Sequence, residues 1–197
     1  MELTTFGFEA SYRVERLESR QVDAVHYFVR PRRTASKTGL HLETRAESLS
    51  FAVTPHTGKP WVGTFEGGPG GITGLFATPS AETLCVAVKG QGFWIPVGAP
   101  ATYQVIPAIP IKEVLVIPQR AILAFVDNTR IAAYGANGLI WLTPDLSWDG
   151  LRITSVSADG IRGVASDSPA GREVPFSVDA TTGASQGGSS PASYGAR

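Results

Sequence analysis

The sequence predicts an all-β fold, an antiparallel meander that forms a β-sandwich, a barrel or a propeller-like domain. Short segments alternate between apolar and polar residues, as half-buried strands do. Prolines are dense between residues 90 and 118, which excludes a long helix there. Turn dipeptides that contain glycine recur at spacings of roughly ten residues, which is typical of strands joined by tight connections. These dipeptides are Asn137-Gly138, Asp149-Gly150, Asp159-Gly160 and Thr182-Gly183.

The first fifty residues predict a meander of short strands. Alternating apolar positions indicate strands over residues 4–15 and 23–30, and again over residues 40–44 and 49–53. A short helical turn over residues 13–20 is a weaker alternative. Between the second and third strands, a basic segment around Pro31 is typical of an exposed turn.

The middle of the chain holds its longest glycine-rich stretch, residues 63–74. This stretch lacks the Lys-Ser/Thr ending of a phosphate-binding loop and is not followed by a helix pattern. We therefore expect turns, bulges or a surface loop. A strand is predicted at residues 84–88, with Cys85 on the face opposite Leu84 and Val86.

The clearest strand patterns lie beyond residue 110. Residues 121–125 are apolar on both faces, which predicts a strand buried on both sides. The turn Asp159-Gly160 predicts a hairpin. Further strands are expected over residues 111–117, 131–134, 139–142, 151–156, 161–165 and 174–178.

Length and composition predict one all-β domain over residues 1–183 and a tail over residues 184–197. A chain of 197 residues is long enough to bury one large core. After Asp179 the composition shifts to alanine, threonine, glycine and serine, which offer too little apolar surface to fold alone.

The charge balance limits the classes of partner. Seventeen Lys and Arg residues balance seventeen Asp and Glu residues, and charged residues make up 17% of the chain. No overall field is available to attract nucleic acid or an anionic membrane, so we expect neither partner. A near-neutral surface resists association poorly, which favours a protein partner or self-association.

Cysteine use and the N-terminus indicate a cytoplasmic location. Cys85 is the only cysteine, so it has no partner for an internal disulfide, and we expect it to be a small buried apolar residue. The first ten residues lack the pattern of a signal peptide. No apolar run approaches the ~20 residues that a membrane helix needs.

One segment resembles a known architecture. Residues 149–183 contain a strand, the Asp159-Gly160 turn, a second strand and the strand Val-Pro-Phe-Ser-Val-Asp. This order resembles the propeller-type meander of uncharacterised bacterial β-propeller-like proteins. The resemblance implies a shape and carries no catalytic residue, so it implies no activity.

Tryptophans and arginines supply the candidate binding residues. Trp148 beside the Asp149 turn and Trp61 after Pro60 are placed to expose an aromatic face, which stacks on sugars, proline-containing peptides or bases. The basic turn offers contacts for phosphates or an acidic partner. Its candidate residues are Arg30, Arg32 and Arg33.

No catalytic or metal-binding residue is assigned, and no cofactor is expected. His26, His41 and His56 recur every fifteen residues, but strands of unequal length give that interval no structural meaning. Aspartates near turns are candidates for a calcium site or a glycosidase carboxylate pair, and they are Asp145, Asp149, Asp159, Asp167 and Asp179. Bonding their own backbone is a sufficient role for Asp149 and Asp159.

We therefore predict a non-enzymatic module for protein interaction or scaffolding, such as a subunit of a bacterial assembly. One alternative is a hydrolase on a β scaffold, with carboxylates that converge in a cleft from several loops. The other alternative is a carbohydrate-binding module that uses exposed tryptophans. An assembly protein would present a large interface or an unpaired edge strand.

Overall fold

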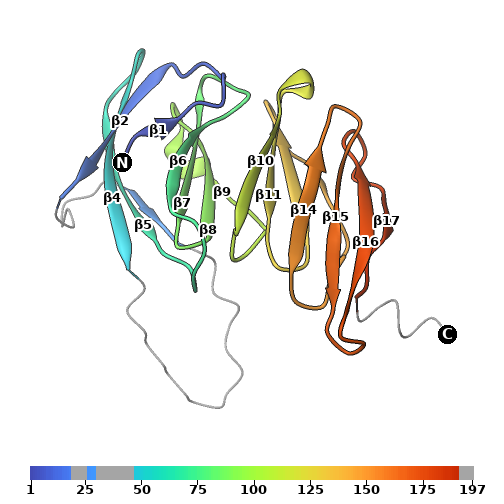
Figure 1. Ribbon diagram of the computed structural model, residues 1–197. Coiled ribbons are helices and arrows are strands. Elements are labelled where there is room, and N and C mark those ends of the chain that lie inside the picture. The colour runs from blue at the N-terminus through green and yellow to red at the C-terminus, as the bar shows by residue number, and fades with distance from the viewer. Residues whose placement is uncertain (19–25, 30–46, 191–197) are drawn as a thin grey trace.

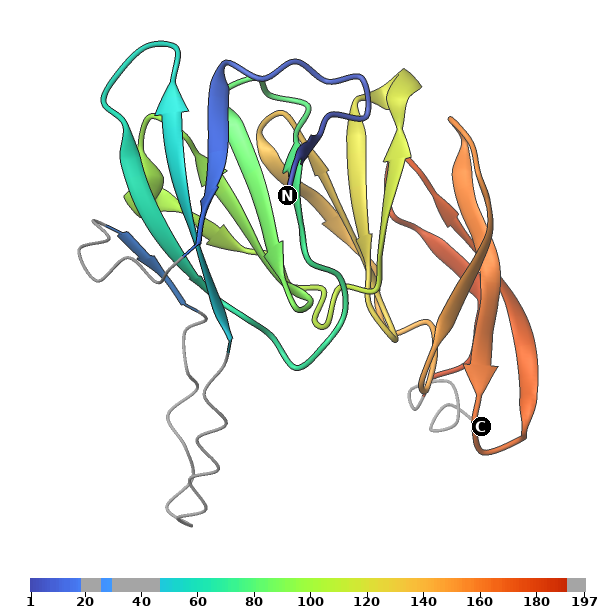
Figure 2. The ribbon, with the colours of Figure 1, turned by 60° about the vertical axis from the view of Figure 1, so that its left-hand side comes forward.

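The structure is a computed structural model that describes residues 1–18, 26–29 and 47–190, and it confirms the all-β class. The strands form four open sheets that are layered face to face, as in a sandwich with additional layers (Figure 1). We number the sheets 1 to 4 by their place in this stack. Figure 2 shows the same layers from the side on which the N-terminal strands lie.

Sheets 1 and 2 contain the N-terminal half of the chain. Two of their strand pairs are parallel, β3 with β5 and β1 with β6, and the others are antiparallel. Sheet 1 has the order β2 (Tyr12–Leu17), β4 (Ser48–Pro55), β5 (Trp61–Glu66) and β3 (His26–Phe28). Sheet 2 has the order β1 (Leu3–Thr4), β6 (Gly74–Ala77), β7 (Thr83–Val88), β8 (Gln91–Pro96) and β9 (Gln104–Val105).

Sheets 3 and 4 are antiparallel meanders in chain order. Sheet 3 comprises β10 (Glu113–Ile117), β11 (Ile122–Val126), β12 (Ile131–Gly135) and β13 (Gly138–Leu142). Sheet 4 comprises β14 (Leu151–Val156), β15 (Gly160–Asp167), β16 (Arg172–Asp179) and β17 (Ser185–Gly187).

Helix is confined, within the described ranges, to the 3-10 turns η1 (Pro100–Thr102) and η2 (Pro118–Arg120). Both begin at a proline, whose fixed φ and missing N–H suit a first helical position. Neither turn has the length or the apolar composition to cross a membrane.

Each junction between neighbouring sheets holds one apolar cluster, and the burial patterns follow from this. The central strands β7 of sheet 2 and β11 of sheet 3 are buried on both faces, whereas β15 of sheet 4 has buried residues at alternate positions. In β7, Leu84 faces sheet 1 and Cys85 faces sheet 3, so the two side chains lie on opposite faces, which the sequence predicts. The predicted strand with two buried faces is β11, which alternates between the clusters on its two sides.

The glycine-rich stretch is a structural junction rather than a free loop. Ile72 donates its N–H to the Ile111 carbonyl at 3.0 Å, and Gly90 donates to the Ile72 carbonyl at 2.7 Å. A Cβ at Gly71 (φ +113°) would collide with the Ile111 carbonyl, and one at Gly90 (φ +76°) with the Gly70 carbonyl. Glycines here allow backbone segments near sheets 2 and 3 to approach each other closely.

Three sequence-based expectations differ from the structure. The strand expected over residues 4–15 is interrupted at Phe6 (φ +53°) and Gly7 (φ +87°), so it becomes β1 and β2. Residues 13–17 lie in β2, not in a helical turn. The expected tail from residue 184 contains β17, which pairs with β16.

The strand expected over residues 40–44 lies outside the described residues, as does most of the one over residues 23–30, of which the structure describes β3 and Val29.

Candidate functional site

Trp61, one of the two tryptophans proposed for recognition, lies in the core. Its side chain is 7% exposed, and its Nε1–H donates a hydrogen bond to the Val97 carbonyl at 3.0 Å. Its ring packs against His26 and Phe28. Because almost no aromatic face is left for a ligand, we do not include Trp61 in the candidate site.

The other proposed binding residues have different positions. Trp148 is half-buried in the segment between β13 and β14, where its N–H donates to the Ser166 carbonyl at 3.2 Å. Part of its surface stays accessible, so its role in recognition stays a prediction. Arg30, Arg32 and Arg33 lie outside the described residues.

The structure does not bring the histidines together within its described ranges. His26 contacts the Trp61 ring at a centroid distance of 5.7 Å, and His56 is exposed after β4. His41 lies outside the described residues. Among residues 1–18, 26–29 and 47–190, no group of three or more His, Cys, Asp or Glu side chains is placed to hold a metal.

Most of the turn aspartates have structural partners. Asp167 is buried and pairs with Arg172, with Oδ2 and Nε 3.1 Å apart. Asp145 pairs with Arg130 at the same distance. The Asp167 pair spans the turn between β15 and β16, whereas the Asp145 pair links the segment after β13 to the turn between β11 and β12.

Asp159 and Asp179 line one shallow hollow of about 770 Å³ on the outer face of sheet 4. The Oδ1 atom of Asp179 accepts hydrogen bonds from the Thr181 and Thr182 N–H groups and from the Thr182 hydroxyl, at 2.8–2.9 Å. Hydrogen bonds from Thr182, followed by that from Thr181, lower the pKa of Asp179 below its ordinary value. A general acid needs a raised pKa, so this carboxylate is adapted to hold a turn rather than to donate a proton.

The same hollow has the polar surface expected of a sheet face in water. Register places Ser155, Arg162, Ser177 and Gln186 in one row across the four strands of sheet 4. No aromatic side chain lines this hollow, so it lacks the stacking surface that a sugar-binding module uses.

The outstanding surface feature is the free edge of sheet 3. Among the described residues, strand β13 ends the sheet and pairs with β12 alone. It carries three exposed apolar side chains: Leu139 is 46% exposed, Ile140 49% and Leu142 37%. Isolated exposed apolar residues are ordinary, but here three lie within four residues of one edge strand.

A β-bulge gives this edge apolar side chains on both faces. The register between β12 and β13 shifts between Ala133 and Tyr134, which leaves Ile140 as the extra residue. Leu139 is paired with Tyr134, which belongs to the cluster between sheets 2 and 3. Ile140 lies over Gly135, since a Cβ built there would be 2.9 Å from its Cδ1.

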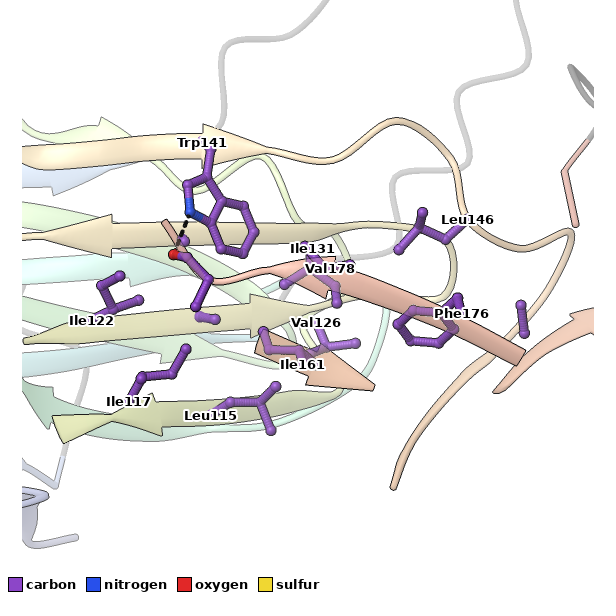
Figure 3. Close-up of a cluster of buried hydrophobic side chains, with 14 residues drawn as sticks. Leu115, Ile117, Ile122, Val126, Ile131, Trp141, Leu146, Ile161, Phe176 and Val178 are labelled. Carbon is purple, nitrogen blue, oxygen red and sulfur yellow. Dashed lines mark hydrogen bonds between the residues drawn. The ribbon is translucent and has the colours of Figure 1, made fainter. Parts of the chain in front are cut away.

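The apolar cluster between sheets 3 and 4 supports this edge from within (Figure 3). Trp141, between the exposed residues, points inward, and its Nε1–H donates to the Ala180 carbonyl at 3.0 Å. The strand is therefore anchored by its buried residue while its neighbours remain exposed.

Comparison of the edge strands shows why β13 is unusual. Strand edges invite pairing with other chains, and proteins protect them with charges, with β-bulges such as the one at Ile140, or by keeping them short. In the described part of the chain, β1, β3, β9 and β17 have two or three residues, and β2, β10 and β14 contain charged residues. Of the described edge strands, β13 alone is five residues long and uncharged.

Sequence reasoning predicts the strand at residues 139–142 but not its exposure. A short uncharged apolar run is also the pattern of a strand inside a sheet. Only the sheet order shows that β13 lies at an edge.

Comparison with models of protein families and with curated proteins finds no match for this chain.

Proposed function

We propose that this protein is a non-enzymatic interaction module, a subunit of a larger assembly that binds a protein partner along β13. The observation that supports the proposal is the uncharged edge strand with Leu139, Ile140 and Leu142 exposed. An extended segment of a partner that pairs with this edge would gain backbone hydrogen bonds and would cover these side chains. The rigid stack of sheets is the scaffold that presents the edge.

The composition agrees with this role. Formal net charge is zero and the charged fraction is low, so nothing repels a protein partner at long range. Cys85 is buried and free, which is compatible with the reducing cytoplasm that we propose as the location.

Photo-crosslinking in cells that express the protein tests this function. A photoreactive amino acid in place of Leu139 should give one discrete adduct, and the added substitution Leu142→Lys should remove it. As a control, the same photoreactive amino acid replaces Ser177, on the outer polar face of sheet 4, where it should give no adduct. Absence of an adduct at 139, or equal adducts at 139 and 177, would refute binding along β13.

A further inference from the structure

We infer that Asn137, in the turn between β12 and β13, is a site of spontaneous deamidation. The amide nitrogen of Gly138 attacks Cγ of the Asn137 side chain, so the N–Cγ bond forms, the Cγ–Nδ2 bond breaks and ammonia leaves. The proton of the attacking nitrogen departs, through water, with the ammonia. No electrons are transferred, and the product is a five-membered succinimide ring closed between neighbouring groups of one chain.

Water then opens the ring at one of its two carbonyl carbons. Cleavage of the N–Cγ bond gives aspartate at position 137, and cleavage of the bond to the peptide carbonyl carbon gives isoaspartate. In isoaspartate the main chain runs through the side-chain carbons. Either product carries a carboxylate, so a chain whose formal net charge is zero gains one negative charge. Water is the only other reactant, so the reaction needs no enzyme.

The position of Asn137 favours ring closure. Asn137 is exposed and lies in the link between the paired residues Gly135 and Gly138. Gly138 has no Cβ to crowd the attacking nitrogen, and its φ of +101° is one that glycine adopts without strain. Gly138 is itself buried, so the ring closes when the turn opens locally. Such opening costs least at the edge of a sheet, and β13 pairs with β12 alone among the described residues.

Asn128, the other asparagine in the sequence, is held differently. It is half-buried, and its carbonyl accepts the Gly150 N–H at 2.8 Å. The nitrogen that would attack its side chain belongs to Thr129, and this N–H donates to Oδ1 of Asp127 at 2.7 Å. The β-branched side chain of Thr129 crowds the same nitrogen. We therefore expect Asn128 to keep its amide, which makes it an internal control.

Deamidation would add a charge at the start of an edge strand that has none. Asn137 directly precedes β13, which contains no charged residue. Charged side chains are one device that protects an edge from pairing with other chains. The edge would therefore become less able to pair as the protein ages. The reaction itself does not depend on the proposed function, so each proposal stands or fails by its own experiment.

Incubation of the purified full chain in mildly alkaline buffer tests the inference. Peptide mapping by mass spectrometry should show loss of the amide at Asn137, as both aspartate and isoaspartate, while Asn128 keeps its amide. Ion-exchange chromatography should show an acidic form that grows with time. Asn137→Gln should abolish that form, because its longer side chain would have to close a six-membered ring. No conversion at Asn137, or equal conversion at both asparagines, would overturn the inference.

Thr129→Gly separates the effect of the fold from that of the Asn-Gly dipeptide. It gives Asn128 the same following residue as Asn137, and the N–H at position 129 can still donate to Asp127. In the folded variant Asn137 should convert several times faster than Asn128, and in urea the two rates should become similar. Equal rates in the folded variant would refute the role of the turn. Circular dichroism checks that the variant is folded, and the unchanged chain gives the deciding result if it is not.

Discussion

Trp141 and Ala180 join sheet 3 to sheet 4, since the indole Nε1–H of Trp141 donates a 3.0 Å hydrogen bond to the Ala180 carbonyl (Figure 3). Trp61 makes an equivalent bond, at 3.0 Å, from sheet 1 to the Val97 carbonyl that follows β8. In both places a large apolar ring fills the space between two sheets while its only polar atom is satisfied by the neighbouring backbone.

Trp141→Phe should lower the free energy of unfolding by about 2 kcal/mol, because it leaves the Ala180 carbonyl without its donor and removes ring volume. Urea denaturation followed by circular dichroism measures this loss. Trp148→Phe, at a half-buried position, is the comparison and should cost less. Equal losses of unfolding free energy for Trp141→Phe and Trp148→Phe would contradict the role given to the hydrogen bond between Trp141 and Ala180.

Gly183→Ala should destabilise the same junction by about 2 kcal/mol or more. Gly183 has φ +71°, and a Cβ there would lie 2.8 Å from Cγ and Cδ2 of Trp141. Backbone strain and collision with a buried ring act in the same direction. Gly171 (φ +62°) has nothing within 4 Å of its Cβ position, so Gly171→Ala isolates the strain alone. Thermal unfolding should show the larger drop in Tm for Gly183→Ala.

Asp127 holds the turn between β11 and β12 and ties it to the segment before β10. Its Oδ1 accepts the N–H groups of Thr129 and Arg130 at 2.7 and 2.6 Å, and its Oδ2 accepts that of Ile109 at 3.1 Å. Asp127→Ala should lower the free energy of unfolding by about 3 kcal/mol. It removes a buried carboxylate and leaves the N–H groups that donate to it without an acceptor.

Asp127→Asn keeps an oxygen that accepts hydrogen bonds from the turn, but its amide group places a donor toward the Ile109 N–H. The loss of unfolding free energy, measured by urea denaturation, should therefore be smaller than that of Asp127→Ala. A loss as large as that of alanine would show that the bond to Ile109 matters more than the turn.

The carboxylate of Asp179 should make the stability of the protein depend on pH at acid pH. Hydrogen bonds from Thr182 and Thr181 lower its pKa below the ordinary value of 3.8. A lowered pKa in the folded state gives a contribution that is fully present above the ordinary value and is lost as pH falls through the lowered value. NMR titration of the Asp179 carboxyl should show the lowered pKa, and Thr182→Ala should raise it.

The matching stability measurement is urea denaturation between about pH 2 and pH 6. The stability difference between the unchanged protein and Asp179→Asn should shrink as pH falls through the lowered pKa. A constant difference would contradict the linkage.

Cys85 should be inert in the folded protein. The side chain is fully buried, and burial raises the pKa of its thiol, so little thiolate is formed or accessible. A thiol reagent should label Cys85 at the rate of unfolding in buffer and at once in denaturant. Rapid labelling in buffer would show that the junction between sheets 2 and 3 opens.

Much of the local structure follows from the sequence. The Asp159-Gly160 turn joins β14 to β15 as predicted, because its sequence favours a tight hairpin. The two-sided burial of β11 follows from apolar residues at successive positions. The strand break at Phe6–Gly7 did not follow, since alternation on either side conceals a turn.

Of the proposed binding residues, Trp61 shows the limit of local reasoning. A proline before a tryptophan suggests a surface turn, yet sheet 2 covers the ring and supplies the Val97 acceptor. Burial depends on which sheet packs on which, and neighbouring residues do not encode it.

The sequence by itself determined that this chain forms short strands joined by tight turns, since alternation and glycine act within a few residues. The tertiary structure decided the rest: four sheets stack, β17 extends sheet 4 into the expected tail, and β13 ends its sheet with Leu139, Ile140 and Leu142 exposed. The physical reason is that an uncharged apolar strand suits the middle of a sheet as well as its edge, and only pairing between distant segments distinguishes the two.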